Sequence, residues 1–396
     1  MKFTGKLGIL LVSIVLGVCF SVDQRSFENA DSQLLTAVRK SDIASAEDLL
    51  RRGASVETCG PNGTPLMLAA DNSDLAMLKF LLEKGANVEA KCNTGGTALV
   101  EVARTANPEI IGLLLPRVSS VEEKKEALFE VIRGGAIAVM EITTNTDSES
   151  APQAMPLEPE PSPRATVVDL FLQNGVGINA KDEEGNTPLI MAAEYGNTEV
   201  LRFLLDHGAD VGARNKAGET ALIAAGCDCP IIDMPPTDKS LKLLLQHGAD
   251  IEAKSNNGTT TLMAAAGFGR TENIELLLDS GARIDARDND GNTALLIAAK
   301  GGGYPTTNAV KLLLDRHANV DARNRLGQTA LMLAASNGPY EAEEILKLLL
   351  GRGADIEATD AHGNTAVDLA IKAHHPEIAQ LLRDTQRSPA FSPRNP

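Results

Sequence analysis

Aromatic residues are scarce in this chain of 396 residues, at 3% of the composition, and tryptophan is absent. Basic residues are also outnumbered: 37 Lys and Arg stand against 53 Asp and Glu, which gives a net charge of −16. Nucleic-acid binding needs basic surface to replace phosphate counterions, and single strands stack on aromatic rings. The composition therefore argues against a nucleic-acid partner. Five cysteines over this length are also too few for a disulfide scaffold.

A long apolar run occurs at the N-terminus, where residues 7–20 read LGILLVSIVLGVCF after a start that carries two Lys. A spanning helix needs about 20 apolar residues, and a shorter run behind a basic start is typical of a secretory signal peptide. We predict a signal peptide over residues 1–21, cut after Ser21, and a linker over 22–30. The protein is then exported, to the periplasm or the medium, with no stable membrane span.

Three alternatives remain open for this segment. Bacterial lipoproteins attach lipid to a Cys, which would be Cys19 here, but Val18 stands where their signal has a small residue. An uncleaved membrane anchor is the second alternative. A buried helix of the mature protein is the third.

The rest of the chain is governed by one repeat. A Thr followed by Pro, Ala or Thr and then Leu or Val recurs in steps of 33, 90, 33, 40, 33, 36 and 36 residues, at Thr64, Thr97, Thr187, Thr220, Thr260, Thr293, Thr329 and Thr365. A second marker, Gly-Ala, follows the Thr by 21 residues at Gly85, Gly208 and Gly281. Two markers in one phase identify a repeat with a base period of 33 residues.

Each repeat predicts two helices and a turn. The Thr caps a short apolar helix, and Pro at the next position suits the first helical residue. A second helix ends in Leu-Leu-x-x-Gly, where the Gly takes the left-handed position after the last turn. A single unit of this kind cannot bury its apolar side, whereas a stack can. We therefore predict an all-α repeat solenoid.

This pattern resembles the ankyrin repeat family, most closely over residues 181–213, KDEEGNTPLIMAAEYGNTEVLRFLLDHGADVGA. The resemblance implies stacked helix-turn-helix units with β-hairpin-like fingers, about ten in number, over residues 31–385, followed by a flexible tail at 386–396. This sequence departs from the family pattern at one position, where a His usually follows Thr-Pro-Leu. Apolar residues replace it here, and we expect apolar contacts in its place: Met67, Val100, Ile190, Ile223, Met263, Leu296 and Met332.

The family resemblance implies a non-catalytic scaffold that binds another protein, without cofactor or metal. Three alternatives remain. They are a secreted effector that acts on host proteins, a periplasmic accessory or chaperone-like subunit of an enzyme, and an enzyme with an unrecognised site. No phosphate-binding loop and no nucleophilic or paired-carboxylate arrangement stands out from the repeat background.

Insertions mark one edge of the predicted stack. Residues 143–164 are rich in Pro and acid and read as a disordered insertion, and shorter insertions lie near 227–238, 301–307 and 338–343. All fall between the two helices of a unit, opposite the fingers. Four aromatic residues lie at this edge, and exposed Tyr is a favoured interface anchor. We predict that they form a partner-binding stripe, or else pack under their own loops: Tyr195, Phe268, Tyr304 and Tyr340.

The finger tips are the family's customary contact region and supply the other candidate residues. These are Asp182, Glu183, Asn215, Lys216, Ser255, Asn256, Asp288, Asn289, Asn324 and Arg325. Below the tips, basic residues recur once per finger, and acids precede several of them by two residues. On an extended chain such pairs share a face, so we expect alternating charges along a ladder.

The His and Cys residues give no metal site. His207 and His247 precede the Gly that ends their helices, one repeat apart, and His374-His375 precede a helix start. Cys227 and Cys229 form a Cys-x-Cys pair that we expect to be free. Cys59 and Cys92 occupy equivalent finger positions, which we expect to lie beyond the roughly 7 Å limit for a disulfide.

Overall fold

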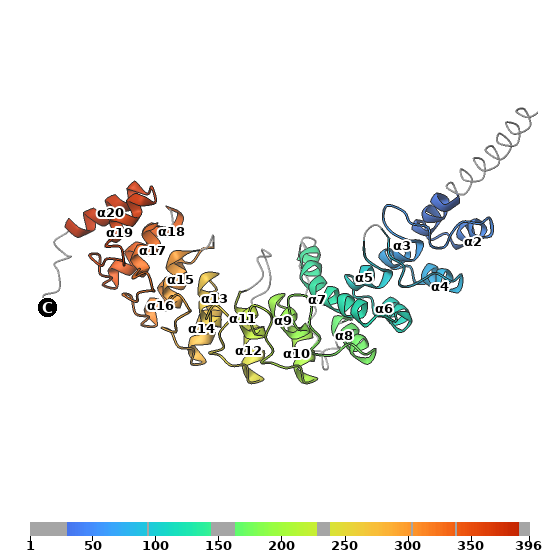
Figure 1. Cartoon of the computed structure of the whole chain (residues 1–396), viewed down its shortest axis with the longest axis horizontal. Helices are drawn as coiled ribbons and strands as arrows, with labels where there is room; N and C mark the ends of the chain where they lie inside the picture. The colour runs from blue at the N-terminus through green and yellow to red at the C-terminus, as the bar shows by residue number, and fades with distance from the viewer. Residues whose placement is uncertain are drawn as a thin grey trace, which may run out of the picture. The chain divides into compact units, whose positions relative to one another are not determined.

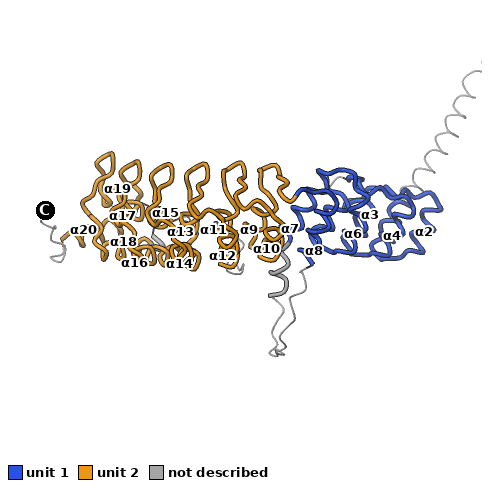
Figure 2. The backbone as a smooth tube through the Cα atoms, turned by 90° about the horizontal axis from the view of Figure 1, so that it is seen from below, with its two compact units in different colours: residues 1–134, 156–177 blue, residues 135–155, 178–396 orange. Residues whose placement is uncertain are grey.

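The computed structural model describes residues 30–92, 95–143, 163–227, 238–301, 304–336 and 339–387. The predicted signal peptide, the linker up to residue 29, most of the 143–164 insertion, Cys229 and residues 388–396 lie outside this part of the chain. The chain divides into two compact units, residues 1–134 with 156–177 and residues 135–155 with 178–396 (Figure 2).

The first unit contains pairs of antiparallel helices (Figure 1). Residues 30–39 are helical and pair with α2 (Ile43–Arg51). The following elements are α3 (Pro65–Asp71), α4 (Leu75–Glu83), α5 (Ala98–Ala103), α6 (Pro108–Leu114), the 3₁₀ turn η1 (Leu115–Arg117), α7 (Val121–Thr143) and α8 (Pro163–Gln173). The degenerate unit predicted over 122–180 therefore still supplies a helix pair, α7 and α8.

The second unit continues the same alternation through six helix pairs. They are α9 (Pro188–Glu194), α10 (Thr198–Asp206), α11 (Ala221–Cys227), α12 (Asp238–Gln246), α13 (Thr261–Gly267), α14 (Thr271–Asp279), α15 (Ala294–Lys300), α16 (Thr307–Asp315), α17 (Ala330–Ser336), α18 (Pro339–Gly351), α19 (Ala366–Lys372) and α20 (Pro376–Arg387). Odd-numbered inner helices contact one another in sequence, and even-numbered outer helices do the same. The core lies between these two rows.

The repeated Thr caps the inner helices as predicted. In seven repeats its Oγ1 accepts a hydrogen bond from the backbone N–H three residues later, at 3.3–3.4 Å, in Thr64, Thr187, Thr220, Thr260, Thr293, Thr329 and Thr365. Thr97 is the exception, because its hydroxyl instead donates to Glu123 Oε1 at 2.6 Å. Glu123 comes from α7, in the degenerate unit, and is itself buried.

The apolar replacements for the family's His are core residues. All seven are buried with exposed fractions of 0–6%, from Met67 to Met332. The prediction that apolar contact substitutes for the missing hydrogen bonds is confirmed.

The insertions fall between paired helices, as predicted, and one of them contributes to a helix. The unit with the 338–343 insertion has an outer helix, α18, of 13 residues, where α10, α12, α14 and α16 have nine. The inserted residues from Pro339 onward therefore lengthen the helix. Similarly, Gln386 and Arg387 of the predicted tail belong to α20. None of the described helices combines the length and apolar character required to cross a membrane.

Candidate functional site

The fingers form a row of loops along one edge of the second unit (Figure 2). Within the described residues they contain no regular strand; the one β-bridge joins Gly60 and Gly63 in the first unit. Successive tips are instead tied by single backbone hydrogen bonds of 2.8–2.9 Å, which run from Lys216 to Glu184, Asn256 to Ala217, Asn289 to Asn257 and Arg325 to Asp290. Fingers of neighbouring units are therefore in direct contact.

Basic side chains reinforce this contact. Each donates to the main-chain carbonyl at the equivalent position of the next finger, from Lys181 to Arg214, Arg214 to Lys254, Lys254 to Arg287, Arg287 to Arg323 and Arg323 to Thr359, across 2.5–3.0 Å. The expected ladder of alternating charges is therefore corrected: the cations bind carbonyl oxygens rather than pairing in series with acids. We call this set the cation ladder.

Acidic side chains form a second set of cross-repeat bonds. Glu252 accepts from the backbone N–H of Arg283 at 2.8 Å, and Asp321 accepts from that of Asp355 at 2.9 Å. In the first unit Glu89 Oε1 accepts from Ser119 N at 2.6 Å and from the Ser119 hydroxyl at 2.7 Å. These bonds from Ser119 lower the pKa of Glu89 below its ordinary value. Both charge types thus stiffen the stack of fingers.

The ten predicted tip residues divide into two classes. The first residue of each pair is half-buried and bonds inside its own finger, because its side-chain oxygen accepts from the backbone N–H four residues later, in Asp182, Asn215, Ser255, Asp288 and Asn324. The second residue is exposed in every finger, in Glu183, Lys216, Asn256, Asn289 and Arg325. In the exposed class, Asn256 and Asn289 also donate from Nδ2 to the main-chain carbonyl of the preceding tip at 2.8 Å. Partner contact stays a prediction for both classes.

A groove lies between the first two fingers of the second unit and the inner helices beneath them. Its volume is about 550 Å³ and its lining includes Glu183, Glu184, Ile190, Glu194, Lys216 and Glu219. Asn215 Nδ2 fixes one wall, since it donates to Asn186 Oδ1 at 3.0 Å and to Glu219 Oε2 at 2.9 Å. The sequence prediction included Glu183 and Lys216 but missed Glu194 and Glu219, which lie 11 and 36 residues beyond Glu183.

The predicted aromatic stripe is only partly assembled. The rings of Phe268 and Tyr304, from neighbouring repeats, pack against each other with centroids 4.9 Å apart, and both residues are half-buried. Tyr195 caps the C-terminus of α9 and is also half-buried, but a full repeat separates it from Phe268. Tyr340 lies in the first turn of α18, and its side chain is outside the described part. A role in partner binding stays a prediction for all four.

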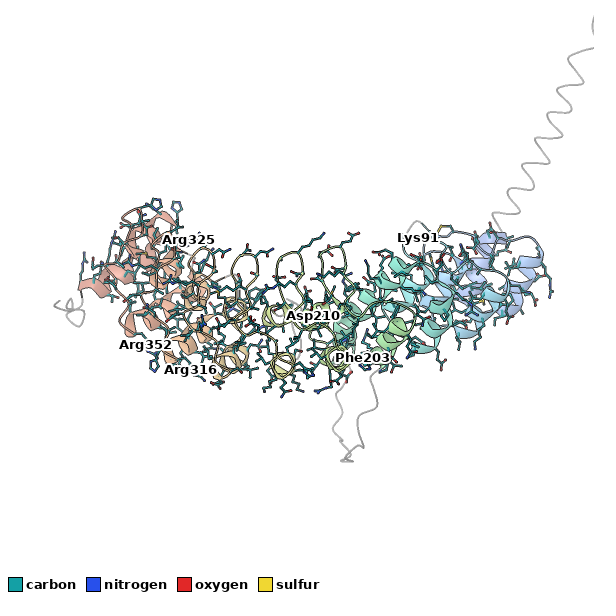
Figure 3. The ribbon with its side chains drawn as sticks, turned by 60° about the horizontal axis from the view of Figure 1, so that its bottom comes forward. Lys91, Phe203, Asp210, Arg316, Arg325 and Arg352 are labelled. Carbon is teal, nitrogen blue, oxygen red and sulfur yellow. A yellow bond between two sulfur atoms is a disulfide. The ribbon has the colours of Figure 1, made fainter. Side chains whose placement is uncertain are left out.

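The outer helices carry a third cross-repeat set, on the side away from the fingers. Arg316 pairs with Glu275 at 3.1 Å and with Asp279 at 2.8 Å, and Arg352 pairs with Asp315. Figure 3 shows Arg316 and Arg352 on this side and Arg325 among the fingers. Exposed pairs of this kind contribute little to stability individually.

The disulfide expectation for Cys59 and Cys92 is wrong. The two residues form a disulfide with their Cα atoms 5.9 Å apart. Helices of neighbouring repeats pack about 8–10 Å apart. Neighbouring fingers touch directly, so equivalent finger residues come closer than their helices do.

The histidines lie where the helix pattern predicted. His207 and His247 cap α10 and α12, and their Nδ1 atoms contact the carbonyls of Phe203 at 2.7 Å and Leu243 at 2.9 Å. His374 precedes α20 with a positive φ of 63°. Among the described residues, no three His, Cys, Asp or Glu side chains lie close enough to hold a metal ion.

Comparison with known families decides the classification. A model described as ankyrin repeats (3 copies) matches residues 34–125, 236–324 and 303–389, and one described as ankyrin repeats (many copies) matches residues 164–225. The first alone covers more than half of the chain. The chain belongs to the ankyrin repeat family. Its helix pairs and fingers are therefore ankyrin repeats, and the all-α solenoid prediction is confirmed.

Individual relatives share only short segments with this ankyrin-repeat protein. Ankyrin repeat-containing protein P1E11.10 of Schizosaccharomyces pombe is 39% identical over 59 residues, 15% of this chain and 28% of the relative. Protein phosphatase 1 regulatory subunit 12A of Mus musculus is 42% identical over 62 residues, 16% of this chain and 6% of the relative. Both are matched over less than a third of their length.

Among solved structures, the human ASB11 ankyrin repeat domain aligns with a TM-score of 0.47 and 26% identity. The alignment covers 55% of this chain and 93% of that domain.

Proposed function

We propose that this protein is an exported, non-catalytic scaffold that binds another protein with the fingers and inner helices of its ankyrin repeats. Ankyrin repeats generally mediate protein–protein interaction. The observation that carries the proposal is the row of exposed tip residues on a stack held by cross-repeat hydrogen bonds. One position in five successive fingers presents one acidic, two neutral and two basic side chains, in Glu183, Asn256, Asn289, Lys216 and Arg325. A rigid row of varied side chains is suited to recognising one partner protein specifically.

Export is supported by two independent features. Residues 1–21 have the composition of a signal peptide. The Cys59–Cys92 disulfide agrees with an oxidising compartment, because disulfides persist outside the cytosol.

In-cell photo-crosslinking tests the scaffold. A photo-reactive amino acid at the exposed tip position 289 of the full-length protein should give a discrete crosslinked species in the source cells or their medium. The same residue at position 202, exposed on the outer helix α10, is the matched control. No discrete species from position 289 in any fraction would contradict the scaffold. The Tyr195/Phe268/Tyr304/Tyr340→Ala variant then tests the loop edge, and unchanged capture would remove the edge from the binding surface.

Cell fractionation and N-terminal sequencing test export. We expect the mature chain to begin at residue 22 and to be absent from the cytosol. Accumulation in the medium would favour the effector alternative, and retention in the periplasm would favour an accessory subunit. An intact N-terminus on cytosolic protein would overturn the export proposal.

A further inference from the structure

The groove between the fingers of repeats 181–213 and 214–253 combines an apolar floor with acidic walls. Ile190 and Ala224, from the inner helices α9 and α11, lie at the floor. Glu183 and Glu184 line it from the first finger and are exposed, while Glu194 stands at the end of α9 and Glu219 at the base of the second finger. Four carboxylates face one cation, Lys216, across about 550 Å³.

The groove is held in shape by the fingers themselves. The carbonyl of Glu184 accepts a hydrogen bond from the backbone N–H of Lys216 at 2.9 Å, which joins the two tips. Asn215 links Asn186 of one repeat to Glu219 of the next. An occupant therefore meets a Glu219 carboxylate that is already positioned, which lowers the entropy lost on binding.

Two of the four acids, Glu183 and Glu194, have no acidic counterpart further along the stack. The position of Glu183 is taken by Asn256, Asn289 and Arg325 further along the stack. The position of Glu194 is taken by Gly267, Lys300 and Ser336. At these two positions the later repeats present neutral or basic residues, whereas Asp290 keeps an acid at the position of Glu184.

We propose that this groove binds a basic segment of the partner protein. A Lys or Arg side chain is complementary to the groove. Its methylene stem packs on the apolar floor, and its charged head group bonds to the carboxylates. This inference rests on the proposed scaffold function and names the chemistry of the partner segment. An acidic or neutral segment would bring no positive charge to the exposed carboxylates of Glu183 and Glu184.

Selection from a phage-displayed library of random peptides on the full-length protein tests the proposal. We expect enriched peptides to carry Lys or Arg, and the best of them to lose about tenfold in affinity for a Glu183→Gln/Glu194→Gln/Glu219→Gln variant. The control variant Glu199→Gln/Glu272→Gln/Glu377→Gln removes the same charge from exposed positions in the first turns of outer helices, and should change affinity less than about twofold. Circular dichroism establishes that both variants are folded.

Three results would overturn the groove proposal. They are enrichment of peptides without Lys or Arg, equal loss of affinity in both variants, and no enrichment at all. Failure of the scaffold proposal can be distinguished from failure of the groove proposal, because the crosslinks at position 289 test the scaffold alone. Crosslinks together with any of these three results would leave the scaffold in place and move its site away from the groove.

Discussion

The guanidinium of Arg287 donates a hydrogen bond to the main-chain carbonyl of Arg323 across 2.6 Å, and the same nitrogen donates to the carbonyl of Gly291 in its own finger at 2.9 Å. One side chain therefore closes its finger and ties it to the next. Because the pattern recurs along the cation ladder, the fingers behave as one connected edge rather than as separate loops.

Removal of one rung of this ladder should destabilise the second unit. Arg287→Ala loses both hydrogen bonds, and we expect a loss of about 1 kcal/mol in the free energy of unfolding, measured by urea denaturation. Arg283→Ala is the control, because that side chain is 80% exposed and lies 3.9 Å from its nearest acid, Glu252. Equal shifts in the two variants would show that the ladder adds nothing beyond surface charge.

A finger glycine should be less replaceable than a helix-end glycine of the same conformation. Gly258 has φ +80° and Gly248 has φ +83°, so Ala at either position meets a left-handed backbone that costs about 1–2 kcal/mol. At Gly258 the new Cβ would also lie 2.7 Å from the backbone N of Asn289, whereas nothing lies within 4 Å at Gly248. We expect Gly258→Ala to lower the urea midpoint further, by an added cost of about 1–3 kcal/mol. Similar midpoints would mean that the fingers can separate freely.

Sequence periodicity predicts features that lie inside one repeat. The Thr caps and the buried residues that replace the family's His follow from position within the unit alone. Thr97 is an exception to this rule. Its partner, Glu123, belongs to the degenerate unit, which lacks the repeat markers.

Contacts between repeats depend on the distance between neighbouring fingers, and the sequence period does not give that distance. The disulfide and the acidic groove both need residues from neighbouring repeats to meet, 33 positions apart for Cys59 and Cys92 and 25 for Glu194 and Glu219. The expectation that stacked fingers hold Cys59 and Cys92 beyond the roughly 7 Å limit was wrong for this reason. The groove needs Glu194 and Glu219 to converge from a helix end and a finger base.

Reduction should loosen the first unit. A disulfide that closes a loop of this size contributes about 2–4 kcal/mol, chiefly by restricting the unfolded chain. Cys59 and Cys92 are 33 residues apart, and we expect a reductant to lower the unfolding midpoint of this unit. Cys59→Ser/Cys92→Ser should unfold at the lower midpoint with or without reductant. A reductant effect that persists in this variant would assign it to another cysteine.

Glu123 should make the stability of the first unit depend on pH. The side chain is 7% exposed, and burial raises its pKa above the ordinary value, opposed by the hydrogen bond from Thr97. A carboxyl with a raised pKa in the folded state binds its proton more tightly there. Ionisation of Glu123 therefore lowers the free energy of unfolding as the pH rises from the pKa of this group in the unfolded chain to its pKa in the folded protein. Glu123→Gln keeps an oxygen that can accept from Thr97, so it should gain stability over the wild type at pH 7 and lose that advantage in acid. A difference between the two proteins that is constant with pH would contradict this assignment.

The contact of Phe268 with Tyr304 separates a packing role from a binding role at the loop edge. Aromatic pairs with centroids 4.9 Å apart have coupling energies of about 0.5–1.5 kcal/mol in double-mutant cycles. We expect Phe268→Ala and Tyr304→Ala to show such coupling in urea denaturation. Tyr195→Ala, a repeat further away, should add independently to Phe268→Ala. Absence of coupling between Phe268 and Tyr304 would show that the rings do not stabilise the stack, and would strengthen the case that they are kept for a partner.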